Sequence, residues 1–259
     1  MVDVLSALSR WVHILAGIVW IGMLYFFNFV NGPFQATIDA EAKKKVNPEL
    51  LPRALYFFRL GAAWTWFTGV LLLLLVFYHG GIMFEGGAGW SGGAIGMLAV
   101  TFLAPFAYDA LHKSGLGKDP KTFGSVAFVL LAVVVCLMHW VGFSYRAYNI
   151  HAGALLGTIM AWNVWFRIWP AQQKILRAVK EGAAPDAALV SLAGARSRHN
   201  TYMSVPLLFT MINPHTTALS GGNFGIPGEA AFLVLLIVVL VGWHVVFHLY
   251  RFGSKVKGF

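Results

Sequence analysis

The sequence predicts an all-α integral membrane protein, a polytopic helical bundle that crosses the membrane about seven times. Of its 259 residues, 58% are hydrophobic and 11% are charged, whereas about a quarter of an ordinary soluble domain is charged. The apolar residues stand in continuous runs, such as 71–75 and 233–240, without the alternation typical of β-barrel strands. A run of about 20 apolar residues is long enough for a helix to cross the hydrocarbon core.

Seven apolar segments are long enough to be such helices. We expect them at residues 8–30, 57–79, 92–112, 122–145, 148–169, 199–216 and 229–251. The first follows Asp3 and lacks the basic leader and cleavage site of a signal peptide, so we expect it to be retained. Because the connections leave no room for a soluble domain, residues 1–259 are expected to form a single transmembrane helical-bundle domain.

The basic residues indicate how the bundle is oriented. Nearly all of them follow the odd-numbered segments, namely Lys43, Lys44, Lys45, Arg53, Lys113, Lys118, Lys121, Lys174, Arg177, Lys180, Arg196, Arg198, Arg251, Lys255 and Lys257. Positively charged connections stay in the cytoplasm. We therefore expect a multi-pass protein of the bacterial inner membrane, with the N-terminus outside and the C-terminus cytoplasmic. This topology explains the formal charge of +9, so no nucleic-acid partner is expected.

Two long polar connections, residues 35–52 and 171–198, are expected in the cytoplasm. Within the second, residues 172–180 predict a short amphipathic helix on an anionic membrane surface, and Asp186 is a candidate helix cap. The lone cysteine, Cys136, excludes an internal disulfide, and the sequence has no CxxCH motif for covalent haem.

Nine histidines are many for a membrane protein, because ionisable side chains in hydrocarbon are costly and mark functional sites. In the expected topology, three share a level near the outer side: His13, His139 and His151. A second group lies toward the cytoplasm: His112, His199, His244 and His248. His79 and His215 fall at the outer rim. His244 and His248 stand four residues apart, on one helix face.

Two levels of histidine predict one or two b-type haems, with iron held by His13, His139, His151, His244 or His248. Along the first segment, Arg10, His13, Gly17 and Trp20 form one stripe, which offers a cation, a gap and an aromatic wall to a flat ring. Gly142 provides space one turn beyond His139. Arg10 and Arg146 are candidate partners of the haem propionates, because guanidinium groups bind carboxylates in a bidentate manner.

Other interpretations of the histidines stay open. An intramembrane histidine can simply bond a backbone carbonyl or a hydroxyl group, and His244 and His248 can form a proton relay. A HExxH metalloprotease is excluded, because Val245 follows His244 where that motif requires glutamate.

A second candidate site lies at the start of the sixth segment, at Arg196, Arg198, His199, Asn200 and Thr201. We interpret this stretch as a helix start, where free N–H groups and the helix dipole attract an anion between two arginines. Such a site suits an anionic heterocycle or a haem propionate. The alternative is an ordinary positively charged flank of a membrane helix.

Three long stretches resemble one family. RWVHILAGIVWIGMLYFFNFVNGP (10–33), YNIHAGALLGTIMAWNVWFRIWPAQQ (148–173) and RSRHNTYMSVPLLFTMI (196–212) are together similar to the membrane domain of the bacterial membrane-bound urate oxidase, or urate hydroxylase, family. The resemblance covers nearly the whole chain. It implies oxidation of urate toward 5-hydroxyisourate, with oxygen from water and electrons passed to a cytochrome c. The cationic stretch at Arg196 and Arg198 suits a urate monoanion but does not single it out.

Members of that family commonly carry a C-terminal cytochrome c domain, which is not found in this sequence. We therefore expect a separate c-type cytochrome as electron acceptor. The rival hypothesis is a non-catalytic haem-binding or structural subunit of a respiratory assembly, and a histidine-lined transporter is a third. The motif of His13, Trp20, Gly22 and Tyr25 is also similar to the opening helix of the bacterial protoporphyrinogen oxidase, which favours His13 as a haem ligand.

Overall fold

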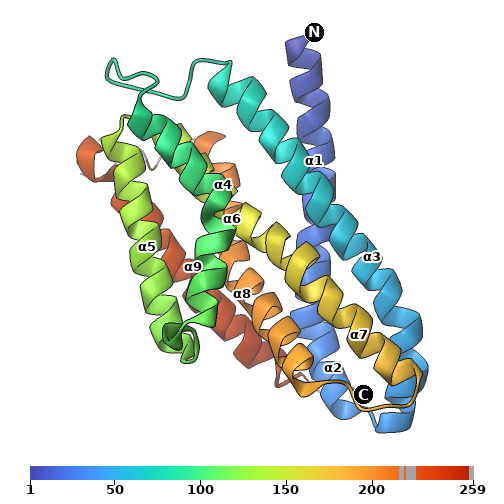
Figure 1. The fold of residues 1–259 in the computed structure, drawn as a ribbon. Coiled ribbons are helices and arrows are strands. Elements are labelled where there is room, and N and C mark those ends of the chain that lie inside the picture. Colours follow the sequence, from blue (N-terminus) through green and yellow to red (C-terminus); the bar gives the residue numbers. More distant parts are fainter. Residues whose placement is uncertain (216–218, 220–225, 257–259) are drawn as a thin grey trace. The chain divides into compact units, whose positions relative to one another are not determined.

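The computed structural model describes residues 1–215, 219 and 226–256. Every regular element among them is a helix, which confirms the all-α prediction (Figure 1). The chain divides into two compact units. The first comprises Met1–Gly69, Met160–Val205 and Trp243–Phe259, and the second comprises Val70–Ile159 and Pro206–Gly242. Each unit is described by itself below.

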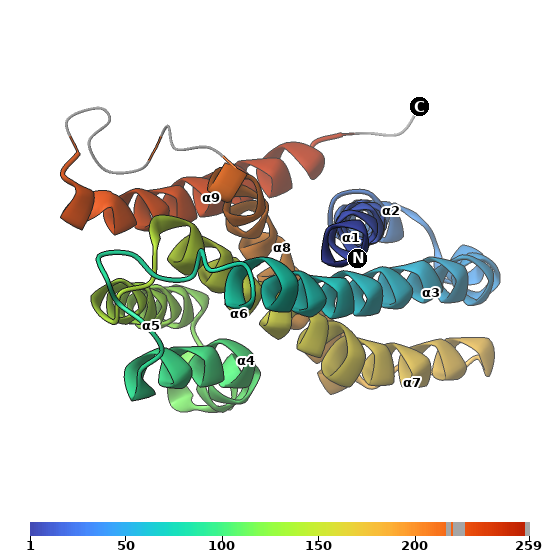
Figure 2. The same cartoon turned by 90° about the horizontal axis from the view of Figure 1, so that it is seen from above.

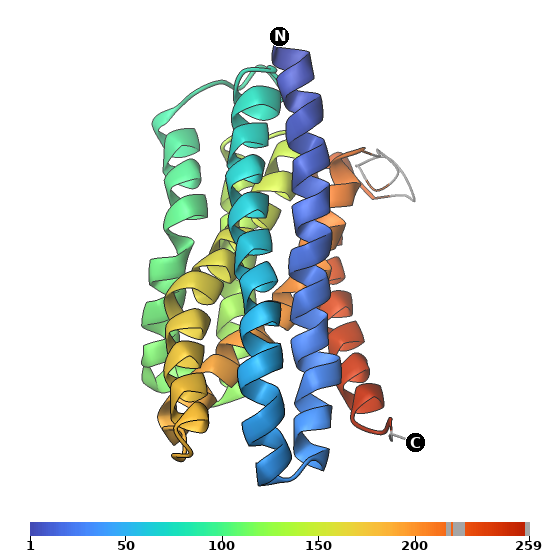
Figure 3. The same cartoon turned by 90° about the vertical axis from the view of Figure 1, so that its right-hand side faces the viewer.

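The first unit opens with α1 (Val2–Tyr25), a π-helical segment η1 (Phe26–Asn31), α2 (Gly32–Thr37) and most of α3 (Ala40–Leu72). It continues with η4 (Val164–Ile168, also π-helical), α7 (Trp169–Lys180), most of α8 (Ala187–Ile212) and the end of α9 (Ala231–Gly253). Figures 2 and 3 show α1 beside α3. The predicted amphipathic helix is confirmed as α7, and Asp186 caps α8 by accepting the Ala188 N–H at 2.8 Å.

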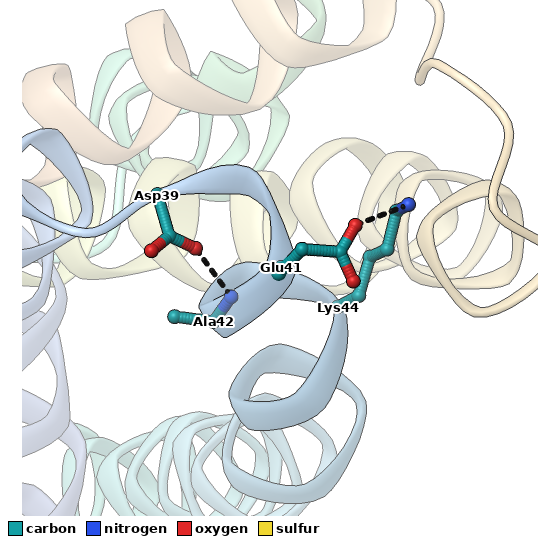
Figure 4. A network of polar contacts seen from close by, with 4 residues as sticks. All are labelled: Asp39, Glu41, Ala42 and Lys44. Atoms are coloured by element: carbon teal, nitrogen blue, oxygen red, sulfur yellow. Dashed lines mark hydrogen bonds and ion pairs between the residues drawn. The ribbon is translucent and has the colours of Figure 1, made fainter.

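The polar connection predicted at residues 35–52 is largely helical, because α3 already begins at Ala40 and contains Pro48 and Pro52. Figure 4 shows how the helix starts. The Asp39 carboxylate accepts the Ala42 N–H at 2.8 Å, and Lys44 pairs with Glu41 at 2.9 Å. An aspartate before the first turn satisfies a backbone donor that the helix leaves open.

The second unit holds η2 (Leu73–Tyr78, π-helical), α4 (Gly92–Lys113), the turn η3 (Gly115–Gly117), α5 (Pro120–Trp140) and most of α6 (Tyr145–Asn163). The short turn η5 (Asn213–His215) follows α8, and the short turn η6 (Gly228–Ala230) directly precedes α9. At the start of α5, Asp119 accepts the backbone N–H and the hydroxyl of Thr122 at 2.7 and 2.8 Å. The backbone hydrogen bond from Thr122 lowers the pKa of the Asp119 carboxyl, which keeps this helix cap ionised.

Five helical segments of the described chain are long and apolar enough to cross a membrane: Val2–Thr37, Ala40–Tyr78, Gly92–Lys113, Pro120–Trp140 and Gly228–Gly253. These five candidate spans support a membrane protein by their length and composition. The predicted fifth and sixth spans correspond to α6 and α8, which are not among these five segments. Both helices bury polar side chains, among them Asn149, His151, Asn163, Arg196, Asn200 and Thr201.

Gly61 allows α1 and α3 to approach closely within the first unit. A Cβ atom at this position would lie 2.9 Å from the backbone nitrogen of Trp20 and 3.0 Å from the carbonyl oxygen of Ala16. Both are backbone atoms, which can move only if the helix moves. Trp20 itself is buried.

We expect Gly61→Val to lower the thermal unfolding midpoint of the detergent-solubilised protein, because overpacking at a helix contact costs about 1–3 kcal/mol. Gly22→Val is the matched control, since no atom lies within 4 Å of the Cβ position at Gly22. Equal midpoints for the two variants would contradict the close approach.

Candidate functional site

The cationic stretch of α8 lies inside the helix and not at its start. Because Asp186 caps the helix at Ala187, Arg196 stands more than two turns beyond the first residue. Backbone N–H groups at such positions are bonded within the helix. The expectation of free N–H groups at Arg196 was therefore wrong, and any anion binding here depends on side chains.

Arg196, Asn163 and Asn200 form a buried network in the first unit, which we call the polar cluster. An Nη1–H group of Arg196 donates to the Asn163 side-chain oxygen at 3.1 Å. Asn163 donates through Nδ2 to the side-chain oxygen of Asn200 at 2.8 Å, and Asn200 donates to the carbonyl of Met160 at 3.0 Å. Arg196 is only 1% exposed. A buried cation is costly unless hydrogen bonds surround it, so this arrangement marks a candidate site.

A second set of hydrogen bonds in the first unit joins α8 to α1 and η1, and η1 to α9. Asn28 donates to the hydroxyl of Ser197 at 2.8 Å and accepts from the hydroxyl of Tyr250 at 2.8 Å. The hydroxyls of Tyr25 and Ser204 lie 3.0 Å apart. Thr201 is buried, and its hydroxyl donates to the Ser197 carbonyl at 3.1 Å.

The remaining predicted members of the substrate site lie on the same stretch of α8. The exposed Arg198 lies over the ring of Tyr250 at 5.4 Å, and His199 is half-buried. The residues of α8 that were predicted to bind substrate thus divide over different faces of one helix.

Each π-helical segment adjoins one of the polar contacts in its own unit. Asn28 lies within η1, Asn163 directly precedes η4, and Tyr78 ends η2. A π turn inserts one extra residue into a helix and occurs frequently at functional sites. Sequence reasoning missed Asn28, Asn163 and Tyr78, although an amide inside an apolar run, as in MAWNVWF (160–166), is a detectable signal.

His13 faces α3 within the first unit. Its Nδ1 atom lies 3.1 Å from the hydroxyl of Thr68, and the Cβ position of Gly69 is 3.0 Å from its ring. A hydrogen bond at one ring nitrogen orients a histidine for metal binding at the other, which fits a ligand that would use Nε2. At Gly17, Thr65 of α3 lies 3.8 Å from the Cβ position, which is ordinary van der Waals contact.

His139, in the second unit, has a buried ring nitrogen without a hydrogen-bond partner in the described chain. This atom is Nδ1, and the hydroxyl of the buried Tyr148 is likewise unpartnered there. The ring of His139 lies 6.0 Å from that of Tyr148 and 5.5 Å from that of Phe232. An unpaired buried polar atom is rare and points to a missing ligand or water. The space predicted beside Gly142 is occupied by Ala88.

His151 is fully buried, and both of its ring nitrogens are hydrogen bonded. Nδ1 lies 2.7 Å from the carbonyl of Ala147, and Nε2 lies 2.9 Å from the hydroxyl of Tyr78. Iron binding by His151 would require Tyr78 to release it.

His244 and His248 lie together on α9, with their Nε2 atoms 3.0 Å apart. Axial ligands of one haem occupy opposite faces of the porphyrin, so two neighbours on one helix face cannot both bind the same iron. At most one of them fits a given haem.

Arg10 and Arg146, the predicted propionate partners, are both exposed. His13 lies in the first unit and His139, His151 and Arg146 lie in the second, so the shared histidine level stays a prediction. Within the described residues, no group of three or more histidine, cysteine or acidic side chains is placed to hold a metal ion.

Comparison with known proteins identifies one family. The family described as urate oxidase N-terminal matches residues 36–257. No curated protein and no solved structure matches the chain. The matched range contains the whole polar cluster and covers most of the sequence, so the chain belongs to the urate oxidase N-terminal family.

Proposed function

We propose that this urate-oxidase-like membrane protein is a haem-containing oxidoreductase that oxidises urate toward 5-hydroxyisourate and passes electrons to a separate c-type cytochrome. The observation that carries the proposal is the polar cluster, in which a buried guanidinium and two side-chain amides meet inside a chain of this family. Urate is a planar monoanion at neutral pH, with carbonyl and N–H groups around its rim.

The residue types of the cluster suit such a ligand. A guanidinium donates in a fixed planar fork, which matches an anionic acceptor edge, and an amide both donates and accepts. We propose Arg196 and Asn200 as the principal urate-binding residues, and Arg198, His199 and Thr201, on other faces of α8, as secondary candidates. Buried polar groups discriminate strongly against ligands that leave them unpaired.

We further propose that one or two b-type haems accept the electrons from urate. His13 is the ligand best supported in the first unit, because Thr68 holds its Nδ1 and orients its Nε2. Of the outer histidines in the second unit, the unpartnered His139 is better supported than His151. One of His244 and His248 is a further candidate, and Arg10 and Arg146 are proposed to pair with propionates. The buried Trp20 is proposed as an aromatic wall beside the haem held by His13.

The proposed topology has seven spans in a single bundle of the bacterial inner membrane, with the N-terminus outside, so that electrons leave on the outer side. The alternation of basic connections supports this orientation.

An anaerobic spectroscopic titration tests the proposal. Purified protein, expressed with ample haem, should show a reduced-minus-oxidised b-type spectrum, and urate alone should reduce it while 5-hydroxyisourate forms. Absence of haem, or haem that urate does not reduce, would overturn the enzymatic proposal.

The rival function, a non-catalytic haem-binding or structural subunit of a respiratory assembly, is favoured by one observation. The three side chains of the polar cluster hydrogen bond to one another, as a purely structural network also would. Copurification with respiratory subunits, with haem present and no urate oxidation, would support this rival.

A further inference from the structure

We infer that Asn163 is a positioning residue, which fixes the donor–acceptor direction of the polar cluster and thereby orients Arg196 and Asn200 toward an anionic ligand. This inference rests on the proposed function, since the ligand is the urate anion. Asn163 lies outside the cationic stretch of α8, and its two amide atoms connect the two residues proposed to bind urate.

The groups at the two ends of the polar cluster, the Met160 carbonyl and the Arg196 guanidinium, determine which atom donates in each hydrogen bond. The Met160 carbonyl can only accept a hydrogen bond, so the atom of Asn200 that meets it at 3.0 Å is the NH₂ group. The other side-chain atom of Asn200 is then an oxygen, which requires a donor. A guanidinium can only donate, so the atom of Asn163 that meets Arg196 at 3.1 Å is its oxygen.

Asn163 satisfies both requirements at once. Its oxygen accepts from Arg196, and its NH₂ group donates to Asn200 at 2.8 Å. An aspartate of the same size would keep the acceptor but lose the donor, and it would place two oxygens against each other at Asn200. Asparagine is therefore the residue type that maintains this direction without adding a charge.

The backbone around Asn163 holds the amide in place. Asn163 is fully buried at the junction of α6 and the π-helical segment η4, and its side chain does not cap that segment. Both of its amide atoms thus serve the cluster. The hydrogen bond from Nη1 to Asn163 restrains the Arg196 guanidinium before the ligand arrives, which lowers the ordering cost of binding.

The second unit provides a matched control. Asn149 is also a fully buried asparagine, whose oxygen accepts from Asn213 at 3.0 Å and whose NH₂ group donates to the Tyr145 carbonyl at 2.8 Å. Asn213 and Asn149 thus form an asparagine pair that ends on a backbone carbonyl, as Asn163 and Asn200 do. Within the described chain, the hydrogen bonds of this second pair involve no cation. Removing Asn149 therefore measures the general cost of losing a buried amide.

The test compares Asn163→Ala, Asn163→Asp and Asn149→Ala in the purified, haem-loaded protein, with urate kinetics and the thermal midpoint measured on each. Loss of a charge-assisted hydrogen bond corresponds to about a 10- to 100-fold effect. We expect Asn163→Ala and Asn163→Asp to lower kcat/KM for urate by that factor, mainly through KM. Asn149→Ala should lower the midpoint as much as Asn163→Ala does, with kcat/KM changed by less than about threefold.

If the wild type oxidises urate and both Asn163 variants have the same kinetics as the wild type, this inference is overturned. The proposed function would then still stand. Equal losses of kcat/KM in Asn163→Ala and Asn149→Ala would also overturn the inference, because a general packing defect would then explain both. A wild-type protein that contains haem but does not oxidise urate would overturn the proposed function itself.

Discussion

Replacing Arg196 by methionine is expected to lower kcat/KM for urate by about 30-fold or more. Removing one partner of a buried, hydrogen-bonded charge pair costs about 2–5 kcal/mol, and the Arg196 side chain is buried in the first unit. Methionine has a similar length and no charge, so the loss reports the guanidinium and not the volume of the side chain. Steady-state oxidation of urate by the haem-loaded protein measures it.

Two further variants test whether the loss of activity depends on the guanidinium of Arg196. Arg196→Lys keeps the charge but lacks the planar fork, so it should restore part of the activity only. Arg177→Met removes an exposed cation from α7 and should leave kcat/KM unchanged. If Arg196→Met and Arg177→Met behaved alike, Arg196 would have no role in binding urate.

The Arg196 variant also has a structural consequence that must be measured separately. Without the guanidinium, the Asn163 oxygen loses its donor from Arg196, and an unsatisfied buried acceptor costs about 1–3 kcal/mol. We therefore expect a lower thermal midpoint together with the kinetic loss. A variant that retains its haem spectrum and its cooperative unfolding while losing urate oxidation separates the two effects.

The helical fold was predictable because its main signal is local. Continuous apolar runs specify spanning helices whatever their neighbours are, and the Asp186 cap and the amphipathic pattern of α7 are likewise local. The true start of α3 at Ala40 was not predictable from hydropathy, which marks the membrane-embedded part and not the helix end. The π-helical segments depend on packing between helices and leave no clear pattern in the sequence.

The candidate site was predictable in part, for a similar reason. Arg196 and Asn200 stood out because charge and amide groups crowd one stretch of α8. Their partner Asn163 is on α6, and the Thr68 partner of His13 is on α3. Such pairings arise only when distant helices pack. The space predicted beside Gly142 was wrong for the same reason, because Ala88 occupies it.

Replacing His13 by alanine is expected to remove one b-type absorbing centre. The hydrogen bond between Nδ1 and Thr68 leaves Nε2 as the nitrogen for iron, and it keeps the ring in one orientation. The reduced-minus-oxidised spectrum and the haem content per protein, measured as the pyridine haemochrome, report the loss without any need for urate turnover. His79→Ala, which removes an exposed histidine outside the proposed site, should leave both values unchanged.

Thr68→Val extends this test from the ligand to its support. Valine has the shape of threonine without the hydroxyl, so the Nδ1 atom of His13 would lose its 3.1 Å partner while the histidine itself remains. Removing such an orienting partner weakens metal binding by about 10- to 100-fold. We therefore expect Thr68→Val to bind haem more weakly than the wild type and more strongly than His13→Ala. An unchanged spectrum in all three proteins would mean that His13 serves only to join α1 to α3 through Thr68, and iron would then have to be held by other histidines.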